Sequence, residues 1–275
     1  MPELPEVETI KRTLEQLVIH KTIKDVTIHW PKIIKKPDDT NHFIHLLQNE
    51  TIRKMDRHGK FLLFYCNDIV LVSHLRMEGK YRVVENSEPI DKHTHVIFHF
   101  TDGTELRYND VRKFGTMHVF PIGKELSEKP LNQLGPDPFQ EGYTLSYVKE
   151  KLLKTTRHIK AALLDQSIIA GLGNIYVDEV LFLARVHPEK RANTLTDEEI
   201  KQIWKYAQIV LDKAVEQGGT TIRSYVDGQG EMGMFQQELY VYGQQKEPCK
   251  HCGIEIVKLK VAGRGTHICP KCQVI

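Results

Sequence analysis

The chain opens with Met1-Pro2-Glu3-Leu4-Pro5-Glu6, and this stretch begins an amphipathic helix. Apolar residues recur at three- and four-residue intervals beyond it, so we expect a helix from about Leu4 to Leu17 with one buried face. Pro5 suits the first helical turn, where its missing N–H costs nothing. The nearby glutamates favour the positive end of the helix dipole. On these grounds alone the stretch is a well-capped N-terminal helix.

Pro2 gives the same stretch a chemical interpretation. A small second residue lets the initiator Met be cleaved, which would leave Pro2 with a free secondary amine. An α-amino group titrates near pH ~8, and a helix N-terminus lowers its pKa further. An amine beside an acid such as Glu3 is the pairing that attacks a carbonyl-like carbon and forms a Schiff base. Catalysis is therefore an alternative to a purely structural helix start.

Composition limits the class of protein. A chain of 275 residues, 40% hydrophobic and 27% charged, has room for two domains and a substantial core. Its net charge of +2 is small, so any site for a polyanion must be a local patch. The sequence has no apolar run of membrane-spanning length and no signal peptide at its start. We expect a cytoplasmic protein without a membrane partner.

Four of the five cysteines form a metal-binding pattern. They stand in two C-x-x-C pairs, Cys249 with Cys252 and Cys269 with Cys272. In an intracellular chain this spacing predicts a tetrahedral zinc site, and we expect one structural Zn²⁺ per chain. Four thiolates leave no open position for a catalytic water. Cys66 stands alone in an apolar run and is interpreted as a buried small hydrophobe.

The first half of the chain after the helix predicts β structure, from Lys21 to about Phe120. Short apolar runs separated by turn signals indicate an all-β sandwich with the helix packed against it. The predicted strands are Ile23–His29, Thr51–Arg57, Lys60–Tyr65, Ile69–His74, Tyr81–Val84, His95–Phe100 and Thr104–Tyr108.

A change of composition follows. Leu131–Tyr143 contains Gly135-Pro136-Asp137-Pro138 and is interpreted as an interdomain linker. Beyond it the pattern is helical near Leu145–Lys154, Ile159–Gln166, Tyr176–Ala184 and Asp197–Gln217. The last of these helices has Thr196 as N-cap and Glu199 at the capping-box position, and Gly218-Gly219 ends it. The stretch from Gly218 to Gln236 is interpreted as a long mobile loop.

These patterns predict an α+β protein of two domains. Residues 1–130 form the N-terminal helix and β-sandwich, and residues 131–143 are the linker. Residues 144–237 form a helical domain, and residues 238–275 form the four-cysteine zinc unit with a β-hairpin.

Two features of the second half suit contact with phosphate. The glycine-rich turn Ile169–Tyr176 leads into a helix, where backbone N–H groups and Asn174 can bind an anion; the alternative is a tight helix connection. The segment from Lys246 to Ile275 holds six Lys/Arg against two Glu. Arg264 lies midway between the cysteine pairs, at the expected tip of a hairpin, and is either a nucleic-acid contact or a solvated surface residue.

Three segments of the β domain place polar and basic groups at strand ends: His58-Gly59-Lys60, Ser73–Gly79 and Asp110–Gly115. Met77 and Phe114, if exposed, are apolar wedges of the kind that enters a base stack. Ordinary core packing is the alternative for both residues.

Together these motifs resemble the bacterial formamidopyrimidine-DNA glycosylases, and the match spans nearly the whole chain. It is carried by Pro2–Glu6, Lys60, Arg76–Gly79, Arg112–Gly115, Gly173–Tyr176 and the four-cysteine finger with Arg264. The resemblance implies an N-terminal helix and β-sandwich joined to a domain with a helix–two-turn–helix motif and a zinc finger. It also implies that DNA lies in the cleft between them.

The resemblance also implies roles for individual residues. Pro2 would attack C1′ of the damaged nucleotide, Glu3 would be the general acid/base, and Lys60 would contact phosphate and assist catalysis. Met77, Arg112 and Phe114 resemble the trio that fills the gap left by an everted base. The catalytic set is Pro2, Glu3, Lys60 and Arg264; the DNA-binding set is His74, Met77, Arg112, Phe114, Asn174, Tyr242, Lys258 and Arg264; the base-recognition set is Glu6, Glu78, Thr220, Thr221, Arg223, Ser224 and Tyr225.

The implied activity is that of a monomeric base-excision-repair enzyme, a DNA glycosylase with AP lyase activity through β- and δ-elimination. Its partner would be duplex DNA containing an oxidised purine such as 8-oxoguanine or a formamidopyrimidine. The related endonuclease VIII enzymes prefer oxidised pyrimidines, but the intact trio and the loop at Thr220–Tyr225 resemble the oxidised-purine branch. A non-catalytic zinc-ribbon protein that binds damaged or bent DNA is a further alternative.

Overall fold

The computed structural model describes residues 1–220 and 233–275. The chain forms two compact units. Unit 1 comprises Met1–Asn132 and Gly218–Gly233, and unit 2 comprises Gln133–Gln217 and Met234–Ile275. Four residues of the predicted base-recognition set, Thr221, Arg223, Ser224 and Tyr225, lie outside the described residues, as does most of the predicted loop.

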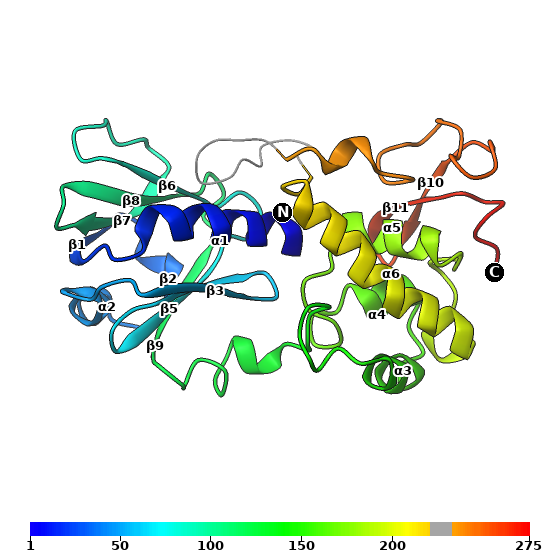
Figure 1. Ribbon diagram of the computed structural model, residues 1–275, viewed down its shortest axis with the longest axis horizontal. Helices are drawn as coiled ribbons and strands as arrows, with labels where there is room; N and C mark the ends of the chain where they lie inside the picture. The colour runs from blue at the N-terminus through cyan, green and yellow to red at the C-terminus, as the bar shows by residue number, and fades with distance from the viewer. Residues whose placement is uncertain (221–232) are drawn as a thin grey trace. The chain divides into compact units, whose positions relative to one another are not determined.

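The opening stretch forms the predicted helix. Helix α1 runs Leu4–Val18, with Glu3 as its N-cap and Pro5 in its first turn. Its apolar face, which includes Val7 and Leu14, is buried in a core shared with both sheets of the sandwich. The helix packs against β3 and β4, and Figure 1 shows it beside β3. The helical spacing of the sequence therefore predicted both the element and its buried side.

The β-sandwich consists of two sheets in unit 1. One sheet has four strands in the order β1-β7-β8-β6, and the other has five in the order β2-β9-β5-β4-β3. All pairings are antiparallel except β2 with β9, which is parallel. The strands are β1 (Ile23–Ile28), β2 (Ile34–Lys36), β3 (Lys54–His58), β4 (Phe61–Tyr65), β5 (Ile69–His74), β6 (Lys80–Glu85), β7 (Thr94–Phe100), β8 (Thr104–Asn109) and β9 (Thr116–Pro121).

Two strands and one α-helix among the described residues of unit 1 were not individually predicted. Strand β2 has only three residues, too few to show an alternating pattern. Strand β9 lies inside the predicted β region but was not named. Helix α2 (Thr40–Leu47) was missed inside that region, although Asp39 caps it by accepting the Asn41 N–H at 2.9 Å. Two helical turns give too short a window for a periodicity argument to separate helix from strand.

Unit 2 contains the four predicted helices and a hairpin. They are α3 (Leu145–Leu153), α4 (Ile159–Leu163), α5 (Asn174–Leu183) and α6 (Asp197–Glu216), with the hairpin strands β10 (Val257–Val261) and β11 (Arg264–Ile268). Helix α6 begins with the predicted capping box of Thr196 and Glu199 and is followed by Gly218 at a φ of 72°. Within the predicted linker, Leu131–Gln133 forms a short 3-10 turn.

Helix α5 is the centre of unit 2. It contacts α4, α6 and β11 (Figure 1). Most of its side chains are buried. Tyr176, Val180 and Phe182 are fully enclosed. No helix among residues 1–220 and 233–275 is long and apolar enough to cross a membrane.

Candidate functional site

The N-terminus is closely packed against the start of α1. Pro2 is buried, whereas Met1 is 49% exposed and holds the prolyl nitrogen in a peptide bond. Glu3 is also buried, with 4% of its surface exposed. Removal of the exposed Met1 would therefore leave the Pro2 amine in a buried position, next in the chain to Glu3, whose carboxyl group is almost inaccessible to water.

Glu6 joins this terminus to the chain segment that follows α6. One oxygen of its buried carboxylate, Oε2, accepts the Glu3 N–H at 2.7 Å. The other, Oε1, accepts the Thr220 N–H at 2.8 Å. Glu6 and Thr220, two members of the predicted base-recognition set, are therefore in direct contact inside unit 1. Their hydrogen bond fixes the point at which the chain enters residues 221–232.

Lys60 lies in the tight turn between β3 and β4 and is 5% exposed. Arg57 anchors this turn, because its Nη1 donates to the Gly59 carbonyl at 2.8 Å. The same guanidinium forms an ion pair with Glu8 of α1 at 3.1 Å. The ion pair is largely buried, which holds the helix that carries Glu3 against the turn that carries Lys60.

His74 ends β5 close to the same turn. Its ring stacks edge-on against Phe61 at a centroid distance of 4.5 Å. Burial, with the positive charges of Arg76 and Lys60, lowers the pKa of His74 to about 3, so the ring is neutral at physiological pH. Its Nδ1 accepts the Arg76 N–H at 2.9 Å, which leaves the proton on Nε2. A neutral donor of this kind can contact a phosphate oxygen.

The three predicted wedge residues, Met77, Arg112 and Phe114, are all exposed in unit 1. Met77 is 39% and Phe114 is 52% exposed, which excludes core packing for both. The Arg112 guanidinium lies 4.7 Å from the centre of the Phe114 ring. Glu78, on the Met77 loop, is half-buried. Their exposure leaves the Met77 and Phe114 side chains available for contact with a partner.

In unit 2 a buried network joins the hairpin to the helices. Lys160 of α4 is fully buried and pairs with Asp178 of α5 at 2.6 Å. Its ammonium also donates to Thr266 Oγ1 at 2.8 Å and to the Gly265 carbonyl at 3.2 Å. Asp178 in turn accepts the His267 N–H at 2.9 Å. The network fixes strand β11, whose first residue is the exposed Arg264.

Asn174 begins α5 and contacts the same strand. Its Nδ2 donates to the Gly265 carbonyl at 2.9 Å. This bond connects the start of α5 to the residue that follows Arg264. Its buried Oδ1 has no hydrogen-bond partner among the described residues. Arg264 lies next to the turn residues Ala262 and Gly263, which have φ angles of 48° and 76°, rather than at the tip itself.

Glu179 of α5 holds the segment that precedes the metal site. Its carboxylate accepts the N–H groups of Tyr240, Val241 and Tyr242 at 2.8 to 2.9 Å. Complete burial raises the pKa of Glu179, although these three bonds oppose the shift. The predicted DNA contact Tyr242 is positioned in this way, and its ring meets His267 at 4.9 Å. Lys258, another predicted contact, is exposed on β10.

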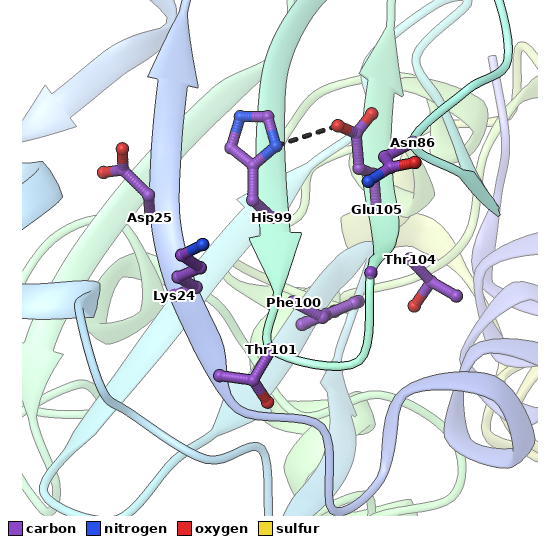
Figure 2. Close-up of a pocket in the computed structure, with 9 residues that line it drawn as sticks. Lys24, Asp25, Asn86, His99, Phe100, Thr101, Thr104 and Glu105 are labelled. Atoms are coloured by element: carbon purple, nitrogen blue, oxygen red, sulfur yellow. Dashed lines mark hydrogen bonds and ion pairs between the residues drawn. The ribbon is translucent and has the colours of Figure 1, made fainter.

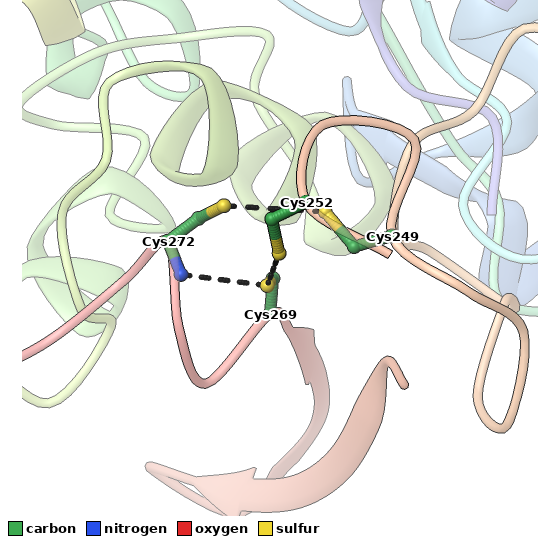
Figure 3. A group of neighbouring side chains, drawn as sticks. All are labelled: Cys249, Cys252, Cys269 and Cys272. Atoms are coloured by element: carbon green, nitrogen blue, oxygen red, sulfur yellow. Dashed lines mark hydrogen bonds between the residues drawn. The ribbon is translucent and has the colours of Figure 1, made fainter. Parts of the chain in front are cut away.

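The four predicted metal ligands converge (Figure 3). The sulfur atoms of Cys249, Cys252, Cys269 and Cys272 all lie within 4.8 Å of one another. Backbone N–H groups of His251 and Cys272 point at the sulfurs of Cys249 and Cys269, each at 3.4 Å. Such bonds favour the thiolate form that a metal requires. Cys66 is buried elsewhere, and burial raises its pKa to about 12, which keeps that thiol unreactive.

A surface pocket in unit 1 contains none of the predicted site residues (Figure 2). It lies on the four-stranded sheet beside His99 and Glu105 and has a volume of about 340 Å³. Its buried carboxylate is already paired, because Glu105 bonds Arg107 at 2.7 Å and His99 at 2.8 Å. The Glu105 carboxylate is therefore already occupied by Arg107 and His99 and is not available to bind a cationic ligand.

Several residues that position the site have no sequence motif. Arg57, Lys160, Asp178 and Glu179 act on partners far along the chain, and each is an ordinary charged residue in its local context. The only available signal was a charged residue within an otherwise apolar helix, as at Asp178 and Glu179 in α5.

Comparison with known proteins agrees with this architecture. Residues 1–117 match the formamidopyrimidine-DNA glycosylase N-terminal domain, residues 134–226 the H2TH domain of the same glycosylases, and residues 246–274 a zinc finger found in FPG and IleRS. A β-sandwich with an N-terminal helix, an H2TH domain and a four-cysteine finger is the domain set of a DNA repair glycosylase. The chain belongs to the formamidopyrimidine-DNA glycosylase family.

Individual relatives cover the whole chain. The formamidopyrimidine-DNA glycosylase of Oceanobacillus iheyensis is 62% identical over 99% of this chain and 98% of its own length. That of Bacillus subtilis is 58% identical over 99% of both chains. The Lactococcus lactis enzyme in complex with DNA containing an abasic site superposes with a TM-score of 0.92, at 42% identity over 99% of this chain and 100% of that one. The same enzyme with N7-benzyl-Fapy-dG DNA gives 0.92 at 43% identity, with full coverage of both.

Proposed function

We propose that this glycosylase removes oxidised purines, such as 8-oxoguanine and formamidopyrimidines, from duplex DNA and then cleaves the strand through a Schiff base on Pro2. The observation that carries the proposal is the arrangement at the N-terminus. Pro2 and Glu3 are buried together at the start of α1, and Glu6 holds the Glu3 backbone. The DNA named with the Lactococcus lactis enzyme, containing an abasic site or a Fapy-dG derivative, supports this substrate class.

The first step replaces the bond to the base. After Met1 is removed, the Pro2 nitrogen attacks C1′ of the damaged nucleotide, the bond from C1′ to the base nitrogen breaks, and the released base takes up the proton that the attacking amine loses. Glu3 supplies the proton that lets the sugar ring open at O4′. The product is an iminium between Pro2 and C1′. Because the amine is secondary, this iminium is permanently cationic.

The iminium then drives strand cleavage. It withdraws electrons from C2′ and so acidifies the C2′ proton. A general base removes this proton, and the C3′–O bond breaks with departure of the 3′ phosphate. Loss of a C4′ proton then breaks the C5′–O bond and releases the 5′ phosphate. Hydrolysis of the remaining iminium regenerates Pro2. Lys60 and His74 in unit 1, and Arg264 in unit 2, are each suited to bind DNA phosphate, Lys60 and Arg264 as cations and His74 as a neutral donor.

Access to the lesion requires base eversion, because a base inside a duplex cannot be attacked. Unstacking costs a few kcal/mol, and apolar wedges offset this cost by filling the vacated space. Met77 and Phe114 suit that role because they are exposed. Arg112 is a hydrogen-bond donor only, which favours the acceptors of an orphaned cytosine.

The four cysteines suit one structural Zn²⁺. Tetrahedral zinc with bonds of ~2.3 Å separates its sulfur ligands by about 3.8 Å. The sulfur separations of 4.0 Å between Cys249 and Cys272 and 3.4 Å between Cys252 and Cys269 fit that geometry. When bound, the metal would cross-link the hairpin to the preceding loop. Arg264 and Lys258 would then contact phosphate from a fixed frame.

Covalent trapping tests the mechanism. Borohydride added during reaction with 8-oxoguanine duplex should reduce the iminium and yield a stable protein–DNA adduct, with the modification on Pro2 by peptide mass spectrometry. A matched preparation that retains Met1 should give no adduct, since its prolyl nitrogen is an amide. Equal trapping of both preparations would refute Pro2 as the nucleophile. Binding without cleavage by the Met1-free protein would favour a non-catalytic DNA-binding function.

A second substrate comparison tests the lesion class. If the enzyme prefers oxidised purines, single-turnover cleavage should be faster for 8-oxoguanine opposite cytosine than for thymine glycol opposite adenine. The reverse order would assign it the pyrimidine preference of endonuclease VIII enzymes.

A further inference from the structure

The wedge residues stand on two tight loops of unit 1. The loop Leu75–Gly79 follows β5 and is closed by the Gly79 N–H, which donates to the Leu75 carbonyl at 3.0 Å. The loop Asp110–Gly115 connects β8 to β9. Each loop holds one non-glycine residue in the left-handed region, Arg76 at a φ of 55° and Lys113 at 59°. Such residues are strained, so the surrounding contacts must hold the loops in place.

Asp110 holds the second loop from inside. Its side chain is 1% exposed and accepts three backbone N–H groups: those of Arg112 at 3.0 Å, Phe114 at 2.8 Å and Gly115 at 2.9 Å. Its own carbonyl is bonded to His95 Nε2 at 2.8 Å. One carboxylate therefore fixes the backbone of both wedge residues on this loop.

Tyr108 connects this carboxylate to the first loop. Its buried ring packs against Tyr81 at 5.1 Å, and its hydroxyl lies 3.3 Å from Asp110 Oδ2. Burial, and then the charge of Asp110, raises the pKa of Tyr108, so the hydroxyl remains a protonated donor. A Cβ added at Gly79 would lie 2.3 Å from this hydroxyl oxygen, and one added at Gly115 only 1.7 Å. The same hydroxyl thus packs against the final glycine of both loops.

We propose that Asp110 and Tyr108 are positioning residues, which hold the Met77 loop and the Arg112–Phe114 loop in one arrangement suited to base eversion. This inference rests on the function proposed above. A mobile loop loses conformational freedom when its side chains enter a base stack, whereas a loop that is already fixed loses less. The cost of eversion therefore depends on two buried residues that touch neither the lesion nor the opposite base.

Trp30 is an intrinsic fluorescent reporter of the Asp110–Gly115 loop. The Lys113 ammonium, at the middle of the second loop, lies 4.1 Å from the centre of the Trp30 ring. The sequence has two tryptophans, so the substitution Trp204→Phe leaves Trp30 as the only one. Its emission then reports whether Lys113 keeps its place, in the absence of DNA and of any reaction.

The decisive variant is Asp110→Asn in the full-length, Met1-free protein. An amide has one acceptor oxygen and one donor nitrogen, so at least one of the three N–H groups loses its partner. Excision of 8-oxoguanine from duplex DNA under single-turnover conditions should slow by about tenfold or more. Cleavage of a duplex that already contains an abasic site should slow much less, because no base has to be everted. Trp30 emission should shift.

Two comparisons complete the test. Asp39→Asn makes the same change at the N-cap of α2 and should alter neither rate nor emission. Tyr108→Phe keeps the ring but removes the hydroxyl, and should shift the ratio of the two rates in the same direction by a smaller factor; it decides the matter if Asp110→Asn does not fold. A ratio and emission equal to wild type in these variants would overturn the proposal. A wild-type protein that cleaves neither substrate would instead count against the proposed enzymatic function.

Discussion

Burial and the positive charges of Arg76 and Lys60 determine the protonation state of His74, a residue that the sequence analysis placed in the DNA-binding set. Its pKa of about 3 means that the folded protein keeps the ring neutral over a range in which an unfolded histidine, with a pKa near ~6.5, becomes charged. The Arg76 N–H selects the tautomer with the proton on Nε2. The residue is thus suited to donate to phosphate without adding a charge.

This shift predicts a pH-dependent stability. Between pH 6.5 and 3 the unfolded state binds more protons than the folded state, so the free energy of unfolding falls as pH falls. At pH 5 the His74 titration lowers the free energy of unfolding by about 2 kcal/mol relative to pH well above 6.5. His74→Asn keeps an acceptor for Arg76 but removes the titration, so it should reduce the stability difference between pH 7 and pH 5 in urea unfolding.

The control for this prediction is His42→Asn, which changes an exposed histidine of α2 and should leave the pH dependence intact. His118, whose pKa burial and the nearby Lys35, Lys36 and Arg76 lower to about 4, supplies a second contribution that remains in both variants. The same slope in His74→Asn as in wild type would contradict the assigned state of His74.

At the scale of elements, the contact between strand β11 and helices α4 and α5 depends on one buried ion pair. Lys160→Met keeps most of the aliphatic stem but leaves Asp178 as a buried carboxylate without its cation. Removal of one partner from a buried pair typically costs about 3–5 kcal/mol. We expect a loss of this size in urea unfolding, together with weaker DNA binding because the backbone beside Arg264 loses its anchor.

An exposed pair provides the matched comparison. Lys154 and Glu150 also lie 2.6 Å apart, but both are solvent-exposed on α3 and its C-terminus. Exposed ion pairs contribute little, so Lys154→Met should leave stability and DNA affinity unchanged. Equal stability of the two variants would mean that the buried network does not hold the hairpin.

The elements themselves differ in how far local sequence could predict them. Helix α6 was predicted with its capping box and its glycine stop because these signals lie within a few residues of the helix ends. Strand β2 has no such signal: it exists because it pairs with β9, some eighty residues later. Helix α2 had a usable N-cap in Asp39, but its two turns lie among residues that read as strand.

The same distinction separates site residues from their supports. The candidate site residues Pro2, Lys60, Arg112 and the cysteines belong to contiguous motifs and could be proposed from the sequence. Their supports could not, because each acts across the chain: Lys160 reaches the Gly265 carbonyl over 105 residues, and Arg57 reaches Glu8 over 49. Packing alone brings such pairs together, and no local pattern encodes the encounter.

At the scale of the whole molecule, charge is the first constraint on DNA binding. A net charge of +2 gives no general attraction to a polyanion, so affinity must come from individual cations in a few places. Each lysine or arginine that neutralises a phosphate contributes about 0.9 to the slope of log K against log salt. Arg264→Ala should therefore lower that slope by about one when binding to an abasic-site analogue is measured across salt concentrations.

The matched change is Arg82→Ala, which removes an exposed arginine of β6 that pairs with Glu88 at 2.9 Å. It alters the net charge equally but belongs to none of the predicted contact sets, so the salt slope should stay at the wild-type value. A similar drop in both variants would show that net charge, rather than the position of Arg264, controls binding.

Metal removal should affect one unit and spare the other. The metal ligands Cys249 and Cys269 belong to a small core with Phe182, Val241 and Ile256, whereas the core of the sandwich is made entirely by unit 1. Because metal binding and local folding are coupled, chelation or Cys269→Ala should unfold the hairpin and release Arg264. We expect loss of DNA binding and of one calorimetric transition, while the transition of the sandwich is retained.

Cys66→Ala, which changes a buried cysteine outside the cluster, should keep one zinc per chain by atomic absorption and normal binding. Full DNA affinity in the metal-free protein would show that the hairpin holds its shape without the metal, and that the buried network of Lys160 and Asp178 suffices to position Arg264.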